Sequence, residues 1–353
     1  GAAGIDHDHD GGNLVLSTIA SARSDEIQLP YPLHSCHAAE YCRDSRERIV
    51  KKHCTGSVKS KIGFVGAGSV AMALVNALSR SGYVVSMIAS RSGIPASQIS
   101  SKFPGMIATE EPQVVADSCS MVFLTVPDDA IESVAMAIRW KPGQAVVHCS
   151  GVMTLDALEV PYSQGALIGG FHPMQTFRPS GSGEKSMHGI TFGIEADPPL
   201  RETLEGIAEN IGGRHIHLSG SARALYHASA VTACGLLATL LHLSEELWEQ
   251  FAGPTVAREA LFPLAWETLE NFRDEGLSGA LTGPLLRGDL GTIEKHITAL
   301  RGVRSALLPI YCHLALAALP MARSKARGIP VERWEAMESA LRQGIQQGDY
   351  ETC

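Results

Sequence analysis

One stretch of the sequence restricts the fold more than any other: KIGFVGAGSVAMALVNALSRSGYVVSMIASRS, residues 61–92. An apolar run leads into two glycines, a helix-like run follows, and a second apolar run ends at Ser90, Arg91 and Ser92. The order strand, tight turn, helix, strand is typical of a parallel sheet with a ligand-binding loop at its first turn.

The turn has the pattern G-x-G-x-x-A, in which Gly66, Gly68 and Ala71 are the fixed positions. The first glycine permits the tight turn, the second lets the backbone approach a pyrophosphate, and the small third residue lets helix and strand pack closely. The helix N-terminus then offers free amides and a positive dipole end to phosphates. The alternative is a glycine turn that serves packing alone. The sequence predicts a dinucleotide site formed by Gly66, Ala67, Gly68, Ser69, Val70 and Ala71.

The end of the second apolar run indicates which dinucleotide is preferred. A site selective for NAD normally has Asp or Glu there, about 20 residues after the glycines, to bind the ribose 2′-hydroxyl. No Asp or Glu occurs from Lys61 to Thr109, and Ser90, Arg91 and Ser92 stand at this point instead. A guanidinium flanked by hydroxyls accepts a 2′-phosphate. We therefore predict NADP as the cofactor, the alternative for Arg91 being an ordinary solvated arginine.

A later loop, LTVPDDAI at residues 124–131, follows another apolar run. Loops at the carboxyl edge of parallel strands face the bound nucleotide. We expect Val126 and Pro127 to line the nicotinamide ribose. Asp129 in the same loop has a simpler role, as a cap of the next helix.

Two polar clusters at predicted strand ends are candidates for the chemistry. VVHCSG contains Ser150, and GGFHPMQTF places His172 and Gln175 just past a strand. Histidine changes charge near neutral pH and is the most frequent general acid or base. His172 is therefore the first candidate for proton transfer, with Ser150 positioning a substrate oxygen and Gln175 orienting substrate or imidazole. The alternative is that His172 only binds backbone in a His-Pro loop.

The C-terminal half adds two more candidates. ARALYHASAV places His227 early in a long helix, and LTGPLLRGD places Arg287 in a glycine-broken turn. We consider His227 as a second catalytic histidine and Arg287 as an anchor for a substrate carboxylate. The alternatives are that His227 is structural and that Arg287 pairs with Asp289, which caps the following helix.

The pattern of apolar segments divides the chain into three parts. Residues 1–58 show no sustained periodicity and are expected to form a poorly structured extension, whose His and Cys spacing fits no zinc site. Over residues 59–219, apolar runs alternate with helical stretches, which predicts an α/β domain with a parallel sheet covered on both faces. Residues 220–353 show only helical patterns. The predicted strands are 62–65, 84–89, 120–125, 145–148, 166–170, 190–194 and 215–218.

Composition argues against several classes of protein. The net charge of -8 over 353 residues argues against nucleic-acid binding. Eight scattered cysteines without a CxxC pair indicate a reducing, cytoplasmic setting. The segment 305–322 approaches the length of a membrane span, but it contains Pro309, His313 and Pro320. We predict a core helix there, and neither a membrane association nor a metal site.

These motifs, in this order, resemble a known family. IGFVGAGSVA, TVPDDAI, HCSG, GGFHPMQTF, YHASAV and LTGPLLRGD look like the Rossmann-like family whose C-terminal half is the domain of unknown function 2520. That family is similar to the wider 6-phosphogluconate dehydrogenase-like superfamily, which includes prephenate dehydrogenases and pyrroline-5-carboxylate reductases. The resemblance covers residues 61–346. It implies an N-terminal Rossmann domain that binds NADP, an all-helical 6-phosphogluconate dehydrogenase C-terminal-like domain, and a homodimer formed through those helices.

The resemblance to prephenate dehydrogenase is the most informative at residue level. That family has a catalytic histidine in a similar His-Pro motif and a substrate-binding serine upstream of it, which match His172 and Ser150. The sequence departs from the family pattern after the motif, where HPMQTF replaces the usual glycine, so the substrate does not transfer. The catalytic lysine of 3-hydroxyacid dehydrogenases is also absent, and His227 stands in roughly its region.

Two functions are consistent with these features. The first is an NADP-dependent oxidoreductase that transfers a hydride to or from a small carbonyl, hydroxyl or imine compound carrying a carboxylate. The second is a non-catalytic NADP(H)-binding sensor or assembly module, with the helical domain as its partner surface. The expected partners are a small-molecule substrate and a second copy of the chain.

Overall fold

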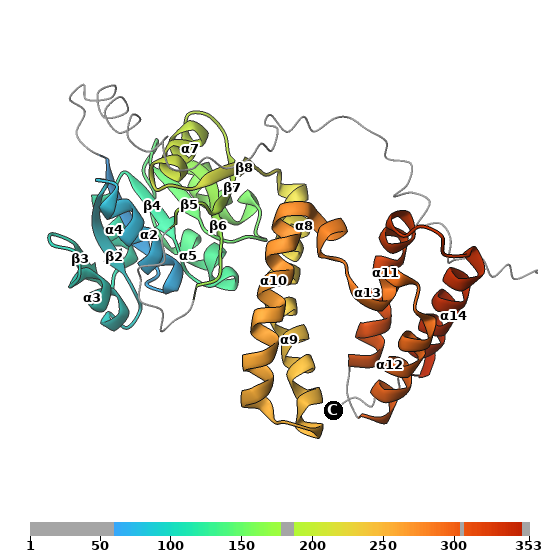
Figure 1. Ribbon diagram of the computed structural model, residues 1–353. Coiled ribbons are helices and arrows are strands. Elements are labelled where there is room, and N and C mark those ends of the chain that lie inside the picture. Colours follow the sequence, from blue (N-terminus) through green and yellow to red (C-terminus); the bar gives the residue numbers. More distant parts are fainter. Residues whose placement is uncertain (1–59, 178–186, 304–306, 348–353) are drawn as a thin grey trace, which may run out of the picture. The chain divides into compact units, whose positions relative to one another are not determined.

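The computed structural model describes residues 60–177, 187–303 and 307–347 (Figure 1). The predicted extension at residues 1–58 lies outside this part of the chain. The fold class is confirmed, since an α/β domain is followed by helices only.

Eight strands form one sheet in the order β3-β2-β1-β4-β5-β6-β7-β8. The strand order reverses between β1 and β4, where the loops after these strands open side by side, as at the ligand-binding switch point of doubly wound sheets. Every neighbouring pair is parallel except β6 and β7. The strands are β1 (Lys61–Val65), β2 (Val84–Ala89), β3 (Ile107–Thr109), β4 (Met121–Leu124), β5 (Ala145–His148), β6 (Leu167–Met174), β7 (Thr191–Ala196) and β8 (Arg214–His217).

The antiparallel pair corrects two sequence predictions. The apolar runs predict an all-parallel sheet, which is wrong at β7. A parallel neighbour requires a crossover, usually a helix, and the described parts of the β6–β7 connection, 175–177 and 187–190, contain none. Pairing with β7 also extends β6 to Met174, so His172 lies inside a strand opposite Gly193 and not just past its end.

Helices cover both faces of the sheet. One face carries α2 (Ser69–Arg80), α3 (Ile94–Ser100) and α7 (Leu200–Asn210), and the other carries α4 (Pro112–Ser118), α5 (Ile131–Ala137) and α6 (Glu159–Ser163). Continuous apolar strands such as β4, which is buried at all four residues, are what two covered faces require.

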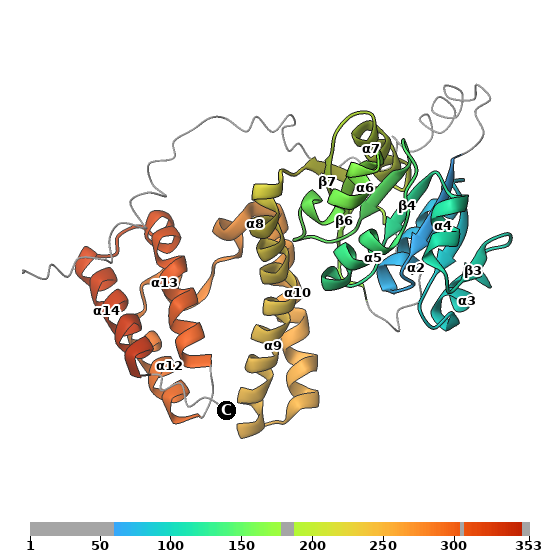
Figure 2. The same cartoon turned by 180° about the vertical axis from the view of Figure 1, so that it is seen from behind.

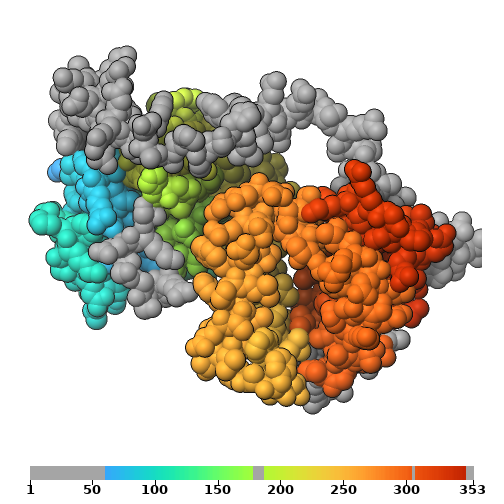
Figure 3. All heavy atoms as spheres, viewed as in Figure 1, coloured from blue at the N-terminus to red at the C-terminus, as the bar shows by residue number. Residues whose placement is uncertain are grey.

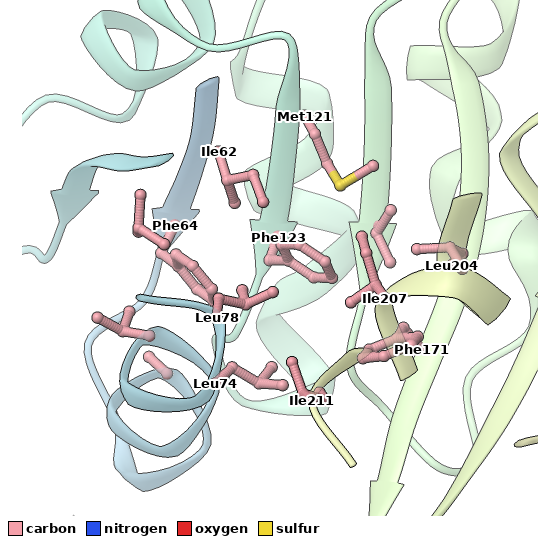
Figure 4. Close-up of a cluster of buried hydrophobic side chains, with 14 of the residues drawn as sticks. Ile62, Phe64, Leu74, Leu78, Met121, Phe123, Phe171, Leu204, Ile207 and Ile211 are labelled. Atoms are coloured by element: carbon pink, nitrogen blue, oxygen red, sulfur yellow. The ribbon is translucent and has the colours of Figure 1, made fainter. Parts of the chain in front are cut away.

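The core on the α2 and α7 face fixes the first turn of the sheet (Figure 4). Phe64 stacks on Phe123 with ring centroids 5.3 Å apart, and Phe123 meets the edge of Phe171 at 5.9 Å. Leu78 of α2 and Leu204 of α7 pack against them and are fully buried. Each such side chain stabilises the fold by about 1.5–3 kcal/mol. This packing holds β1 and α2 on either side of the glycine turn.

After β8 the described chain is helical. α8 (Gly220–Val231), a π-helical turn (Thr232–Leu236) and α9 (Leu237–Glu246) follow one another almost without a break, and a 3-10 turn (Leu247–Gln250) ends them. α10 (Pro254–Ala280) returns antiparallel beside α9, as Figures 1 and 2 show. The remaining helices are α11 (Gly283–Arg287), α12 (Leu290–Gly302), α13 (Leu307–Lys325) and α14 (Val331–Gln347).

α13 contains most of the segment considered as a membrane span. Its Leu308, Cys312 and Leu319 are buried in a core shared with α12 and α14. Two described helical segments, 220–250 and Leu307–Lys325, are long and apolar enough to cross a membrane by length and composition. The second packs in this core, as predicted for a core helix.

Candidate functional site

The first glycine of the turn after β1 is required by the backbone. Gly66 has a φ of 103°, and a Cβ there would lie 2.5 Å from the carbonyl carbon of Thr125. The Thr125 hydroxyl donates to the Gly66 carbonyl at 2.8 Å. Gly66 thus permits the loop after β1 to touch the loop after β4.

The second glycine has a different role. Gly68 has a φ of -84°, which any residue adopts, and a Cβ there would meet nothing within 4 Å. It precedes α2, whose N-terminus has no side-chain cap. Open space in front of uncapped helix amides fits a pyrophosphate. Ala71, fully buried under the turn, supplies the close packing of helix and strand.

The predicted 2′-phosphate residues lie after β2. The Ser90 hydroxyl accepts a hydrogen bond from the amide of Ala96 at 3.2 Å, while Arg91 and Ser92 are exposed. None of the ion pairs within the described chain involves Arg91. Glu110, just beyond β3, brings a carboxylate here, since a Cβ on Gly93 would lie 2.6 Å from its Oε1. Arg91 is available to an anion, with an acid nearby.

The loop after β4 lies beside the glycine turn through Thr125. Val126 is half-buried and Pro127 is exposed. Asp129 lies in a 3-10 turn, and neither this turn nor the following helix α5 has a side-chain cap. The predicted capping role of Asp129 is therefore wrong. The contact of Val126 and Pro127 with a nicotinamide ribose stays a prediction.

His172 of β6 and Tyr226 of α8 are the centre of the candidate site. Nδ1 of His172 lies 2.8 Å from the phenol oxygen. Burial, followed by the charges of His227 and Arg223, lowers the pKa of His172 to about 4. Burial raises the pKa of Tyr226 to about 12. At neutral pH the imidazole is therefore uncharged and the phenol keeps its proton.

The surroundings of the phenol favour one tautomer of His172. The backbone of Gly193 hydrogen-bonds Tyr226 and lowers its pKa, as an amide donor does. A Cβ on Gly193 would lie 2.9 Å from the phenol oxygen, so a glycine is needed there. Because the phenol oxygen accepts from Gly193, its hydrogen is free to be donated to Nδ1 of His172. A neutral imidazole that accepts at Nδ1 carries its proton on Nε2.

Gly151 of the HCSG motif lets the two histidines converge. A Cβ there would lie 2.6 Å from Cδ2 of His227 and 2.9 Å from Nε2 of His172. The two imidazole centroids are 6.0 Å apart and nearly perpendicular. Nε2 of His172 therefore faces the loop after β5, beside His227.

Ser150 holds that loop together. Its buried hydroxyl oxygen accepts the amides of Val152 at 3.2 Å and Met153 at 3.0 Å. Only the hydroxyl hydrogen is left for another partner. The predicted role of Ser150 in positioning a substrate oxygen stays a prediction.

Arg223 ties α8 to the sheet. Its fully buried guanidinium pairs through Nε with Glu195 of β7, and Nη1 donates to the Ser150 carbonyl at 2.9 Å. Tyr226 lies three residues further along α8, on the same face of the helix. The ion pair therefore sets where the phenol meets His172.

His148 lies beneath this cluster. It is fully buried, and burial, followed by Arg223 and His172, lowers its pKa to about 3. Within the described chain both its ring nitrogens and Nη2 of Arg223 lack a hydrogen-bond partner. A Cβ on Gly170 would lie 2.9 Å from Cζ of Arg223 and 3.2 Å from Cε1 of His148, so glycine makes room for both. His148 is thus held neutral inside the protein.

Two other predicted residues are placed away from these contacts. Gln175 is exposed, and its carboxamide oxygen accepts the amide of Thr176 at 2.8 Å. Arg287 is exposed at the end of α11. Asp289 caps α12 by accepting the Thr292 amide at 3.1 Å, as predicted. The hydrogen bonds from Thr292 and, less strongly, the charge of Arg287 lower the pKa of Asp289. Substrate binding by Gln175 and Arg287 stays a prediction.

Sequence reasoning brought together His172, Ser150 and His227 but assigned no role to Tyr226, Arg223 or Glu195. A sequence signal exists for Arg223 and Tyr226. They precede His227 by four residues and by one residue in the same helix, a spacing that places all three side chains on one face. Glu195 had no signal, because nothing in its strand marks a partner 28 residues downstream.

Known proteins share this organisation. A Rossmann-like domain model matches residues 52–173, and the domain of unknown function DUF2520 matches residues 190–318. No curated protein matches the sequence.

Solved structures extend the likeness. A proposed NADP oxidoreductase from Bacteroides fragilis is 25% identical with a TM-score of 0.58, over 76% of this chain and 98% of that one. A protein from Thermotoga maritima is 24% identical with a TM-score of 0.59, over 75% and 99%. A reductive aminase from Aspergillus terreus, solved with NADPH, shares the fold at 15% identity and a TM-score of 0.51, over 82% and 95%. These likenesses show the fold, a Rossmann-type domain followed by a helical region.

Proposed function

We propose, from the membership of this chain in the Rossmann-like family with a C-terminal DUF2520 domain, that it is an NADP-dependent oxidoreductase. Its substrate is a small carbonyl, hydroxyl or imine compound carrying a carboxylate. The observation that carries the proposal is that the uncharged His172 converges with Tyr226 and with the ring of His227 at the edge of the sheet where the glycine turn also opens.

The residues of the turn fit the cofactor. The open space at Gly68 and the uncapped amides of α2 suit a pyrophosphate, and the unpaired Arg91 suits a 2′-phosphate. When bound, NADPH supplies the hydride. Val126 and Pro127 would lie beside its nicotinamide ribose.

The proton path follows from the tautomer of His172. As the substrate oxygen or nitrogen gains negative charge, Nε2 gives it a proton, and the phenol proton of Tyr226 moves to Nδ1. Burial raises the pKa of Tyr226, and the charge of Arg223 offsets part of that rise. Nδ1 then returns its proton to the phenolate while Nε2 takes a proton from solvent, which restores both side chains. His227 contacts the substrate from the other side of Gly151, and Arg287 anchors the carboxylate.

Turnover of NADPH with panels of keto acids and cyclic imines tests the proposal. We expect His172→Ala to lower kcat by about 10²–10⁴-fold with an unchanged NADPH affinity. His296→Ala is a matched control, because His296 makes a similar bond to Tyr311 at 3.0 Å in the C-terminal helices. Unimpaired turnover by His172→Ala would remove this mechanism. NADPH binding without any turnover would favour the sensor function instead.

We also propose that the protein works as a cytoplasmic homodimer through α9 and α10. α10, part of which is in view in Figure 3, exposes large apolar side chains along its length. Exposed apolar patches of this kind mark interfaces. The side chains, 45–65% exposed, are Phe262, Leu264, Trp266, Leu269 and Phe272.

A bilayer suits this surface less well than a second copy. The first part of the apolar segment 220–250 is fixed to the sheet by Arg223 and Tyr226. The 18 residues between Tyr226 and Glu245 span about 27 Å as a helix, short of the roughly 30 Å of a hydrocarbon core. Sedimentation of wild type and Trp266→Glu tests the proposal: a monomeric wild type, or a variant that stays dimeric, would contradict it.

A further inference from the structure

A second cluster of chemically reactive side chains lies on β8, apart from the candidate active site. It contains Glu205 of α7 together with His215 and His217 of β8. We propose that these three residues bind a divalent transition-metal ion of the Zn²⁺ type. The proposal does not depend on the redox function.

The strand and the helix aim the donors at one point. Residues two apart in a strand share a face, and His215 pairs in register with Phe192, which is buried in the core that α7 covers. Both imidazoles therefore stand on the α7 side of the sheet. Glu205 and Glu209 lie one helical turn apart on the facing helix.

The distances suit a metal centre. One donor atom each from Glu205, His215 and His217 lies within 4.8 Å of the other two. Nε2 of His217 is 2.8 Å from Oε1 of Glu205, and Nδ1 of His215 is 3.7 Å from Oε1 of Glu209. Ligands 2.0–2.2 Å from a tetrahedral Zn²⁺ are roughly 3.3 Å from each other. Small side-chain rotations bring the three donors to that spacing, with Glu209 or water as a fourth.

The burial pattern also separates this cluster from an ordinary surface pair. Nδ1 of His215 is buried and has no hydrogen-bond partner within the described chain. Two imidazoles and a carboxylate form a donor set that Zn²⁺ prefers. His242, in contrast, is a single imidazole 3.8 Å from Glu245 and 3.7 Å from Glu246 on one exposed helix. It offers one nitrogen donor and serves as the matched control.

The metal would fasten an edge strand. Among the described strands, β8 is at the edge of the sheet and pairs with β7, and it leads into α8, which carries Arg223 and Tyr226. Binding of an ion between α7 and β8 would hold that strand in place. Sequence spacing alone predicts no metal here, because the glutamate comes from a different element.

Cobalt titration of the full chain tests the proposal. Co²⁺ is added to protein freed of metal by a chelator, and visible d–d absorption is recorded, followed by displacement with Zn²⁺. We expect wild type to bind one more Co²⁺ per chain than His217→Ala, His215→Ala or Glu205→Gln, whose affinity at this site falls at least about 100-fold. His242→Ala should titrate like wild type. The Tm of wild type should rise with Zn²⁺, and the rise should be smaller in the three variants.

Other cysteines and histidines of the full chain do not blur the outcome. The proposed site has only nitrogen and oxygen donors, so it gives no thiolate-to-metal charge-transfer band. Circular dichroism without metal confirms that each variant is folded, which is expected because His217 is more than half exposed. The proposal is overturned if wild type shows no d–d absorption, or if the three variants bind Co²⁺ with the stoichiometry and affinity of wild type.

Discussion

Replacement of Arg223 by methionine tests how α8 is held on the sheet. The guanidinium is fully buried, and its partner Glu195 is only 15% exposed. Removing one member of a buried pair costs about 3–5 kcal/mol, because the other charge is left without compensation. Methionine keeps most of the packing of the arginine stem, so we expect the free energy of unfolding to fall by about 3 kcal/mol. Adding Glu195→Gln to this variant removes the carboxylate charge that was left without a partner. The double variant should therefore recover about 1–3 kcal/mol of the free energy of unfolding.

Urea unfolding followed by circular dichroism measures these changes, as shifts in midpoint at constant m-value. Arg342→Met is the control, because it breaks an exposed pair with Glu338 of similar length, 2.7 Å. Its expected cost is below about 0.5 kcal/mol. A cost for Arg223→Met as small as the control, or a double variant without recovery, would refute the view that this ion pair fastens α8.

Three further predictions concern the cofactor and the histidines. Arg91→Ala should weaken NADPH binding about 10–100-fold and leave NADH binding unchanged, while Glu110→Gln should strengthen NADPH binding. If calorimetry shows the same NADPH affinity for wild type and both variants, Arg91 does not bind the 2′-phosphate. Tyr226→Phe leaves Nδ1 of His172 without its hydrogen-bond donor. We expect ¹⁵N NMR of the variant to show both tautomers of His172 and the free energy of unfolding to fall by about 1–3 kcal/mol. A variant in which His172 stays entirely in the Nε2–H form would contradict the role of Tyr226. The pKa of His148 is about 3 in the folded protein, below its unfolded value, so between about pH 6.5 and pH 3 the unfolded state binds more protons at this residue. As the pH is lowered across that range, His148 alone should reduce the free energy of unfolding by about 1.4 kcal/mol per pH unit. His148→Leu should reduce this slope, and identical pH dependences of the urea midpoint would refute it.

The first half of the fold is readable from sequence because its signals are local. The strand and helix around Gly66 are short and separated by glycines. The observed strand Lys61–Val65 lies within one residue of the predicted 62–65, and the expected helix follows as Ser69–Arg80. The helical pattern after residue 220 is equally local. Periodicity and turn residues depend on near neighbours only, which is why they survive without tertiary information.

The parts that sequence did not predict depend on distant pairings. The antiparallel β7 and the resulting extension of β6 follow from which strand lies beside which, and an apolar run does not encode direction. The partnership of Arg223 with Glu195 likewise joins a helix to a strand 28 residues earlier.

The glycines of the site show the same limit. Gly151 and Gly193 have no positive φ, so neither marks a turn. Each is needed because a side chain from another element occupies the position of its Cβ: two imidazoles at Gly151, the phenol of Tyr226 at Gly193. Close approach of this kind becomes visible only when the elements are placed together.

The NADPH affinity of Gly68→Asp tests most directly whether the turn after β1 holds a dinucleotide. The backbone at Gly68 suits any residue, the position of its Cβ is open, and Asp is favoured at the start of a helix, so the variant should fold with a Tm at least as high as that of wild type. A carboxylate in that space would repel the pyrophosphate, and we predict at least about a 100-fold loss of affinity by fluorescence titration. Wild-type affinity in a folded Gly68→Asp protein would contradict the cofactor site and the oxidoreductase function built on it.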